Sequence, residues 1–502
     1  MSESENSRGL WARRFALLGA AIAVTAGLLF ALSDNPKYAL GEMVRGSALD
    51  AGFRMVMGEV RGRLRPSVDR CIVKHQAKSP TNIILIAVDT LRADHLGFQG
   101  YERNVSPNLD ALARDSLTFR QAISAAPWTT PAFVGVFTGS HPGALGFEGD
   151  PLLLPSEVPV LAQVLCEAGW QTAGVVSHSY VGVRYGFDRG FDRWDERNAG
   201  GHTHISSENI TAQSLEFIDS FTDDRRPFFL FAHYFDPHSD YLEHEEHRFS
   251  DGVSGSALSE ADNINELIKL ASAGKLDAAS VQQIVDSYDS EIAHTDEQIG
   301  LLIAQLKERG LYKDSMIIFL GDHGEMLVER PENLLGHGMA VYQALVHVPL
   351  LIKLPGSKRI GRIDTPVSMV DVLPTILDAI GHPAPPPSAS GERSLLRVDR
   401  GSPRPVFAQT RRDGFRDTVL HGKWKLIRDT SINTSELYDV TRDEDERDDL
   451  SRRFPDVVSH MESLLVDWHK ELEASRSGIR ATAPPQLTPA EREQLRGLGY
   501  VE

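Results

Sequence analysis

A set of aspartates and histidines follows the apolar segments of this sequence, at the points where buried strands would end. Its members are Asp89 after NIILIAV, His233, Asp236 and His238 around the end of PFFLFA, and Asp322 and His323 after SMIIFLG. In open α/β sheets, functional sites form at the carboxyl ends of the strands, so we expect these side chains to gather at one edge of one sheet. Carboxylates combined with an imidazole suit a divalent cation, with Zn²⁺ or Mn²⁺ favoured over Ca²⁺.

Each of these residues also has a purely structural interpretation. An aspartate after a strand often caps the next helix, which the run DTLR beginning at Asp89 would allow. A single histidine is more often structural than a ligand, and we favour a buried, hydrogen-bonded structural role for His233. The run DHGE beginning at Asp322 is harder to explain in this way, because two potential ligands are adjacent where a strand ends.

The segments that must position these residues alternate between strands and helices. Continuous apolar runs, typical of strands buried on both faces, cover 82–88, 172–177, 227–232, 315–320 and 348–353. Helical patterns cover 108–114, 158–168, 209–221, 279–308 and 371–379. This alternation predicts an α/β fold with a central, mostly parallel sheet flanked by helices. After the loop PAPPPSAS, strand-like pieces and a helix over about 454–473 predict a small C-terminal α+β subdomain.

The N-terminal segment has a different character. Residues 15–32 read FALLGAAIAVTAGLLFAL, without a charge, and follow Arg13 and Arg14. At about 1.5 Å per residue, such a helix is just long enough to cross a membrane, and the flanking cations predict a cytoplasmic N-terminus. We predict a retained single-pass signal-anchor, with the rest of the chain periplasmic or extracellular. A cleaved signal peptide is the alternative, with a weak cleavage site at ALS ending at Ser33.

Composition excludes some classes of protein. The 502 residues include 52 Lys and Arg against 70 Asp and Glu, a net charge of −18 that argues against general nucleic-acid binding. The two cysteines, Cys71 and Cys166, cannot build a disulfide scaffold. The sequence patterns divide the chain into six segments. They predict a cytoplasmic N-terminus at 1–14, the anchor at 15–32, a membrane-proximal linker at 33–80, the main domain at 81–383, the C-terminal subdomain at 384–474 and a tail at 475–502.

Several motifs, in one order, resemble the sulfatase branch of the alkaline phosphatase superfamily. They are VDTLRADHLGFQGY from Val88, APWTTPAFVGVFTG from Ala126, PFFLFAHYFDPHSDY from Pro227, the run ending in SMIIFLGDHGE, and GHG at 336–338. The similarity extends from about residue 82 to about residue 473. It implies an alkaline phosphatase-like fold, a bound divalent metal, and an enzyme that hydrolyses anionic sulfate or phosphate esters.

The resemblance implies roles for individual residues. The metal ligands are Asp89, Thr129, Asp322 and His323. Thr129 also stands at the position of the nucleophile, and coordination to a metal favours the alkoxide that such a nucleophile needs. His238 and His337 match positions that contact the anionic group. A second metal held by His238, His337 and Asp236 is an alternative interpretation, and Glu325 is expected to orient the metal-binding loop.

The sequence departs from the family at the nucleophile. Sulfatases carry Cys or Ser there, within C/S-x-P-S-R, and oxidise it to formylglycine. This chain has TTPAF from Thr129, so Ala132 and Phe133 replace the Ser and Arg, and formylglycine chemistry is not expected. An unmodified Thr is similar to the nucleophile of nucleotide pyrophosphatase/phosphodiesterases and phosphoethanolamine transferases. The family signature GKWHLG is also absent, and His178 within VVSHSYVG is its candidate substitute.

Three functions remain open at this point. The first is a membrane-anchored, metal-dependent hydrolase that forms an ester on Thr129, with one or two Zn²⁺ or Mn²⁺ and a preference for phosphorus over sulfur. The second is a transferase that passes a phospho-headgroup to a lipid or glycan. The third is a catalytically silent binding protein that keeps the fold, an option raised by the lost Arg and GKWHLG features.

Overall fold

The computed structural model describes Val73, residues 81–484 with gaps, and residues 486 and 492; the gaps are 150, 200–205, 222–225, 239–240, 251–263, 331, 384–392, 401–403 and 477–480. The chain divides into two units, Met1–Asp69 and Arg70–Glu502, and the described residues belong to the second. The predicted anchor, nearly all of the predicted linker and most of the tail lie outside the described residues. Among the helices that the structure describes, none is both long and apolar enough to cross a membrane.

A mixed, mostly parallel sheet of eight strands forms the centre of this unit, in the order β12-β2-β11-β7-β1-β6-β4-β5. The strands are β1 (Ile83–Val88), β2 (Leu117–Phe119), β4 (Gln171–Val175), β5 (Arg193–Asp195), β6 (Phe228–Tyr234), β7 (Met316–Gly321), β11 (Leu350–Lys353) and β12 (Gly361–Ile363). β1 pairs in parallel with both β6 and β7, and all of its residues are buried. The predicted α/β fold class is confirmed, and the long apolar runs are its central strands.

The strand predicted at 348–353 runs against its neighbours. β11 pairs antiparallel with both β7 and β2. After β7 the chain passes through β8 (Met326–Leu327), β9 (Leu335–Gly336) and α11 (Gln343–Val346), with no long helix to carry it back across the sheet. It therefore re-enters the sheet from the end at which it left, because a parallel strand would need a crossover connection.

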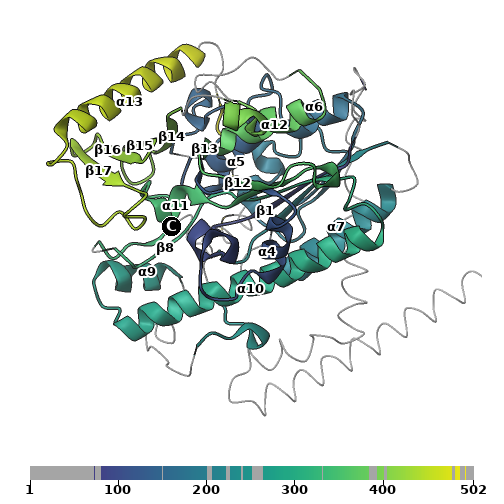
Figure 1. Ribbon diagram of the computed structural model, residues 1–502, viewed down its shortest axis with the longest axis horizontal. Helices are drawn as coiled ribbons and strands as arrows, with labels where there is room; N and C mark the ends of the chain where they lie inside the picture. Colours follow the sequence, from purple (N-terminus) through teal and green to yellow (C-terminus); the bar gives the residue numbers. More distant parts are fainter. Residues whose placement is uncertain are drawn as a thin grey trace, which may run out of the picture. The chain divides into compact units, whose positions relative to one another are not determined.

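Helices cover both faces of the sheet. One face packs against α5 (Thr129–Thr138), α6 (Leu161–Glu167) and α12 (Val372–Ala379), and the other against α4 (Pro107–Ala113), α7 (Ser207–Phe221), α9 (Ile264–Ser272) and α10 (Ala278–Glu308). Alternate residues of β1, starting with Ile83 and Ile84, enter the two cores, as the pleat of a strand requires. The long helix α10 runs beneath the sheet beside α7 and α4 (Figure 1).

A smaller antiparallel sheet lies C-terminal to the main one. Its strands are β14 (Val406–Thr410), β15 (Arg416–His421), β16 (Trp424–Asp429) and β17 (Thr434–Asp439), and α13 (Pro455–Ser475) packs on them. Trp468 of α13 stacks on Phe407 of β14, with ring centroids 4.8 Å apart. Short pairings connect β3 (Ala122–Ile123) with β10 (His347–Val348) and β13 (Val367–Ser368).

Candidate active site

Thr129 is the first residue of α5. Trp128 before it is extended, with φ −160° and ψ 158°, and the helix begins abruptly after that residue. The first amide N–H groups of a helix have no partner inside it, so this end carries a partial positive charge. Thr129 is fully buried. Its hydroxyl therefore lies in a water-poor environment at a helix end that favours negative charge.

Asp89, Asp322 and His323 meet at the carboxyl ends of two neighbouring parallel strands. Asp89 follows β1, and Asp322 and His323 follow β7. Each offers a ligand atom, and these atoms lie within 4.8 Å of one another. All three residues are at most 1% exposed. We refer to Asp89, Asp322 and His323 as the central cluster.

The Thr129 hydroxyl reaches this cluster directly. Its Oγ1 lies 3.3 Å from Nε2 of His323. The other ring nitrogen, Nδ1, lies 2.9 Å from the carbonyl oxygen of Gly324 and so must carry a proton to donate. Burial lowers the pKa of His323 to about 3, so the ring is neutral and Nε2 is left as an acceptor facing Thr129.

The backbone is shaped to hold Asp322. Its Oδ1 accepts hydrogen bonds from the amides of Thr90, at 3.1 Å, and His323, at 2.7 Å. Thr90 has a φ of 52°, in the left-handed region that is uncommon for a residue with a side chain. The Tyr288 hydroxyl of α10 donates to the Thr90 carbonyl at 2.7 Å and fixes this turn.

Three of the four carboxylate oxygens of the central cluster lack hydrogen-bond partners among the described residues. None of the described residues makes a hydrogen bond of ordinary geometry with either oxygen of Asp89 or with Oδ2 of Asp322. Burial and the nearby Asp89 charge hold the pKa of Asp322 well above its usual range. For Asp89 burial acts in the same direction, but the imidazoles of His178 and His233 outweigh it and hold its pKa well below that range.

A divalent cation fits this arrangement. Buried carboxylate oxygens without hydrogen bonds are costly, and a cation between Asp89 and Asp322 would satisfy them and cancel their repulsion. The donor set of two carboxylates, one imidazole and the Thr129 hydroxyl suits Zn²⁺ or Mn²⁺. These are the four residues that the sequence assigns to the metal, and the fold brings them together.

The two histidines assigned to the anion lie on one side of the cluster. The ring centroid of His337 is 4.6 Å from that of His323 and 4.9 Å from that of His238. His337 shares a hydrogen bond of 3.1 Å with Oε2 of Glu325, through Nδ1. Burial raises the pKa of Glu325 to about 8. Glu325 therefore fixes the orientation of His337 beside the cluster.

Comparison with known proteins places this site in a family. The family model described as Sulfatase matches residues 81–382, which contain all the residues of the central cluster. The chain belongs to the sulfatase family. The "Ulvan-active sulfatase" of Formosa agariphila is 26% identical over 336 residues, and the matched region covers 62% of this chain and 64% of that relative.

Solved structures agree on the fold. A 2-O GAG sulfatase superposes with a TM-score of 0.65 at 16% identity, covering 83% of this chain and 100% of the other. The phosphonate monoester hydrolase of Agrobacterium radiobacter superposes with a TM-score of 0.61 at 19% identity, covering 78% and 96%. The alkaline phosphatase-like fold of the sulfatase family is therefore the fold of this chain.

Two residues have contacts that the sequence did not suggest. His233 is buried, as predicted, but its ring lies beside the site: Nε2 is 3.5 Å from Oδ2 of Asp89, and neither ring nitrogen makes a hydrogen bond of ordinary geometry with a described residue. Asp236, which the alternative interpretation assigned to a second metal, uses one carboxylate oxygen to hold the start of α7. Its Oδ2 accepts hydrogen bonds from the hydroxyl and amide of Ser207, at 2.6 and 3.2 Å, where α7 begins.

The position of the sulfatase arginine is part of the hydrophobic core in this chain. Phe133 is fully buried, and its ring meets that of His233 edge-on at 5.0 Å. Nδ1 of His178 lies 3.3 Å from the same Oδ2 of Asp89 that His233 approaches, so the suggested substitute for the missing signature does reach the site.

One residue near the site was not identified from the sequence. Arg412 follows β14 of the C-terminal sheet, and its guanidinium lies 5.6 Å from the ring centroid of Trp128. Gly338 has a φ of 92°, in the left-handed region that favours glycine, and a Cβ there would lie 3.2 Å from Cδ of Arg412. The Thr410 hydroxyl donates to the Gly338 carbonyl at 2.7 Å and holds the two segments together. Nothing local in the sequence signals this contact.

Proposed function

We propose that this protein is a metal-dependent hydrolase of sulfate or phosphate esters in which Thr129 is the nucleophile. The observation that carries the proposal is the 3.3 Å separation of the Thr129 hydroxyl from Nε2 of His323, within a buried cluster of two carboxylates. A nucleophile and its partners within hydrogen-bond reach are the arrangement that covalent catalysis requires. The curated relative supports a sulfate ester as substrate, and the absence of formylglycine supports a phosphate ester.

Asp89, Asp322, His323 and Thr129 would hold a divalent cation, which would supply charge neutralisation and Lewis acidity at the ester. The chain contributes the rest of the activation. The N-terminus of α5 favours negative charge on the Thr129 oxygen, and the bond from Nδ1–H of His323 to the Gly324 carbonyl leaves the Nε2 lone pair free to bind the cation. Burial excludes water, so these interactions act in a medium of low dielectric constant.

The anionic group of the substrate would be held by the side chains that lie beside His323. His238 and His337 lie together there, and Arg412 adds a permanent positive charge at the rim beside Gly338. Hydrogen bonds from charged donors to anions are about twice as strong as neutral ones. We assign these three residues to binding and orientation of the ester oxygens.

The second half of the reaction, hydrolysis of the ester formed on Thr129, favours phosphate esters over sulfate esters as substrates. Attack by Thr129 breaks the ester bond to the leaving alcohol, which departs with a proton, and leaves the acidic group on the threonine oxygen. A formylglycine hydrate has a second hydroxyl that can expel this group, whereas Thr129 has one. Water must therefore attack the central atom of the threonine ester, a second displacement of the kind that phosphate esters undergo. Phosphate esters are accordingly the expected preferred substrates.

The decisive experiment traps the intermediate. Protein reconstituted with Zn²⁺ or Mn²⁺ is mixed with aryl phosphates, phosphodiesters and aryl sulfates, quenched in acid and mapped by mass spectrometry. The expected result is a phosphorylated peptide that contains Thr129, absent in Thr129→Val and present in Thr129→Ser. Turnover in which Thr129→Val matches the wild type would refute the mechanism.

The same assay separates hydrolysis from transfer and from a silent protein. With an acceptor alcohol present, a hydrolase releases free phosphate or sulfate, whereas a transferase forms a new ester with the alcohol. A protein that turns over no member of the panel, in the wild type and in Thr129→Val alike, would be the silent binding protein.

We also propose that residues 15–32 anchor the protein in a membrane, with the sulfatase-family domain on the periplasmic or extracellular side. The support is the uncharged apolar segment after Arg13 and Arg14. Expression of the full chain and of a chain beginning after residue 32, followed by membrane flotation and protease protection, tests this. Recovery of the full chain in the soluble fraction would contradict it.

A further inference from the structure

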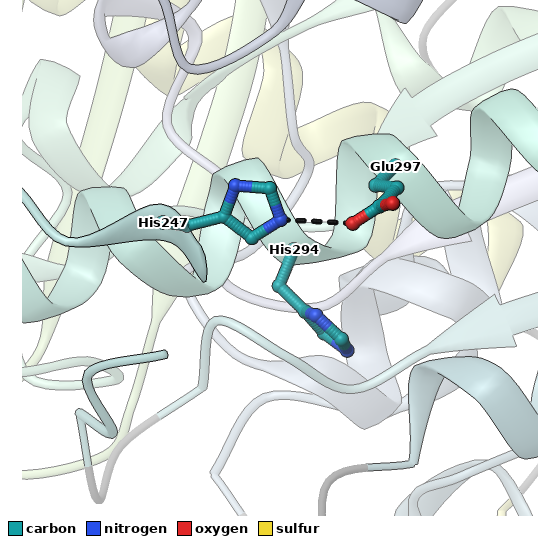
Figure 2. A group of neighbouring side chains, drawn as sticks. All are labelled: His247, His294 and Glu297. Carbon is teal, nitrogen blue, oxygen red and sulfur yellow. Dashed lines mark hydrogen bonds and ion pairs between the residues drawn. The ribbon is translucent and has the colours of Figure 1, made fainter. Parts of the chain in front are cut away.

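Two histidines and one glutamate form a second group outside the active site, beside α10. His247, His294 and Glu297 each offer a metal-ligating atom, and these atoms lie within 4.8 Å of one another. His294 and Glu297 are one turn apart on α10, so they share one side of the helix. His247 comes from the short helix η6 (Glu245–His247). Figure 2 shows the His247 ring turned toward Glu297, with His294 leaving α10 beside that pair. We call these three residues the peripheral cluster.

The contacts within the cluster leave coordination capacity unused. Nε2 of His247 lies 2.9 Å from Oε2 of Glu297. His294 is only 8% exposed, yet its Nε2 makes no hydrogen bond with a described residue, and the nearest carboxylate oxygen, Oε1 of Glu208, lies 3.4 Å away. A buried polar nitrogen without a hydrogen bond is rare in native proteins and calls for a partner.

A third imidazole adds to this group. His244 stacks on His294, with ring centroids 4.1 Å apart and planes 6° from parallel. It is 7% exposed, and its Nε2 also has no hydrogen-bond partner among the described residues. Glu208 and Glu297 place carboxylates beside these imidazoles, so both kinds of donor that zinc accepts are gathered here.

We propose that the peripheral cluster is a zinc site, with His247, His294 and Glu297 as ligands and His244 packed against it. Two imidazoles and one carboxylate, with a fourth position for water, are a ligand set that Zn²⁺ accepts. Zinc bonds of about 2.0–2.1 Å to nitrogen and oxygen set the ligand atoms of a tetrahedron about 3.3 Å apart. The side chains of His247 and Glu297 are 22% and 55% exposed, which gives them room to close the remaining distance.

Zinc at this position joins two parts of the chain. η6 belongs to the segment that follows His238 and Tyr241, and the amide of His244 in this segment already donates to the Ser290 hydroxyl of α10 at 2.8 Å. A cation between His247 and α10 would fasten the same segment at a second point. The site is therefore structural, and it stabilises the segment that leads away from the anion-binding histidine.

The test measures zinc binding with the active site disabled. The full chain carrying Asp322→Asn, stripped with chelator, is titrated with Zn²⁺ alone, and bound metal is counted by mass spectrometry after dialysis. We expect a zinc equivalent that is lost, or weakened about tenfold or more, when His247→Ala or Glu297→Gln is added, since each removes one of few ligands. Co²⁺ loaded in place of zinc should show a visible absorption band that changes with the same substitutions.

Two controls make the result specific. His460→Ala removes an exposed histidine on α13, and Glu246→Gln removes an exposed carboxylate beside His247, so neither should change the zinc count. In the wild-type background, His247→Ala should leave ester turnover unchanged, which separates this site from the proposed catalytic metal. Zinc binding that is absent in Asp322→Asn, or unaffected by both His247→Ala and Glu297→Gln, would overturn the proposal and leave an ordinary histidine–glutamate hydrogen bond.

Discussion

The central and peripheral clusters contain the same kinds of ligand in opposite environments. Asp322 and His323 are at most 1% exposed, and the central cluster brings two carboxylates together. The peripheral cluster has one carboxylate between histidines, and Glu297 remains 55% exposed. Burial makes the repulsion of the central carboxylates strong, whereas solvent weakens the interactions of the half-exposed Glu297. Our two proposals assign the reaction to the more buried cluster and a stabilising role to the more exposed one.

The largest expected contrast between the clusters is in turnover. Thr129→Val removes the proposed nucleophile while preserving its shape, so we expect kcat to fall about 10³-fold or more. His247→Ala should leave kcat within twofold or so of the wild type, because it contacts no proposed reacting group. Steady-state kinetics on the preferred ester measure both. Equal losses in the two variants would mean that the clusters are not functionally separate.

A smaller effect is expected for the charge at the rim. Arg412→Ala should lower kcat/KM about 10–100-fold, mainly through KM, because it removes a charged donor to the substrate anion. The matched control is Arg442→Ala, an exposed arginine on the same C-terminal part of the chain. Added salt should weaken the effect of Arg412 as it screens the charge. An unchanged KM would exclude Arg412 from substrate binding.

Asp322→Asn in the central cluster should raise the stability of the protein while it abolishes turnover. In metal-free protein, Asp322→Asn removes one of two repelling carboxylates, and its amide can donate toward the Asp89 oxygens that have no hydrogen bond. We expect the free energy of unfolding to rise by about 1–3 kcal/mol, while turnover is lost. Urea denaturation without metal measures this change.

The control for this prediction lies in the peripheral cluster. Glu297→Gln in metal-free protein should change the free energy of unfolding by about 0.5 kcal/mol or less, because the side chain is exposed. A loss of stability in Asp322→Asn would show that its backbone hydrogen bonds outweigh the repulsion between the carboxylates.

The smallest expected effect is the change in Tm as the two metals are removed in turn. When zinc-loaded protein is titrated with a chelator, the partly exposed peripheral metal should leave in a first phase, and the buried central metal in a second. The first phase should lower Tm by a few degrees at most, since binding stabilises by a term that grows only logarithmically with ligand. Calorimetry alongside metal analysis checks this. Loss of turnover in the first phase would reverse the assignment.

The site residues that directly follow a strand can be predicted from the sequence. Asp89, Asp322 and His323 follow strands that are recognisable by their apolar runs, and parallel strands bring their carboxyl ends to one edge. Thr129 came from the resemblance to sulfatases, because no periodicity marks the first residue of α5. The direction of β11 was not predictable, since apolar runs are alike in parallel and antiparallel strands.

The missed residues depend on contacts between distant segments. His233 looked like a core residue because it lies within an apolar strand, and only the pairing of β6 with β1 brings it to Asp89. Arg412 follows a strand of another sheet and comes to lie beside Gly338. The peripheral cluster likewise requires η6 to lie on α10. Such contacts are set by tertiary packing, which leaves no mark on the local pattern.

The position of Arg412 has a consequence for how this protein could diversify. The residues proposed to bind the metal and attack the ester follow strands of the main sheet or begin α5, whereas Arg412 is carried by a short turn between β14 and β15 of a separate sheet. Exchange of that turn would alter which ester is selected without touching the reacting groups. A library of β14–β15 turns on this scaffold is therefore a direct route to enzymes with new specificities.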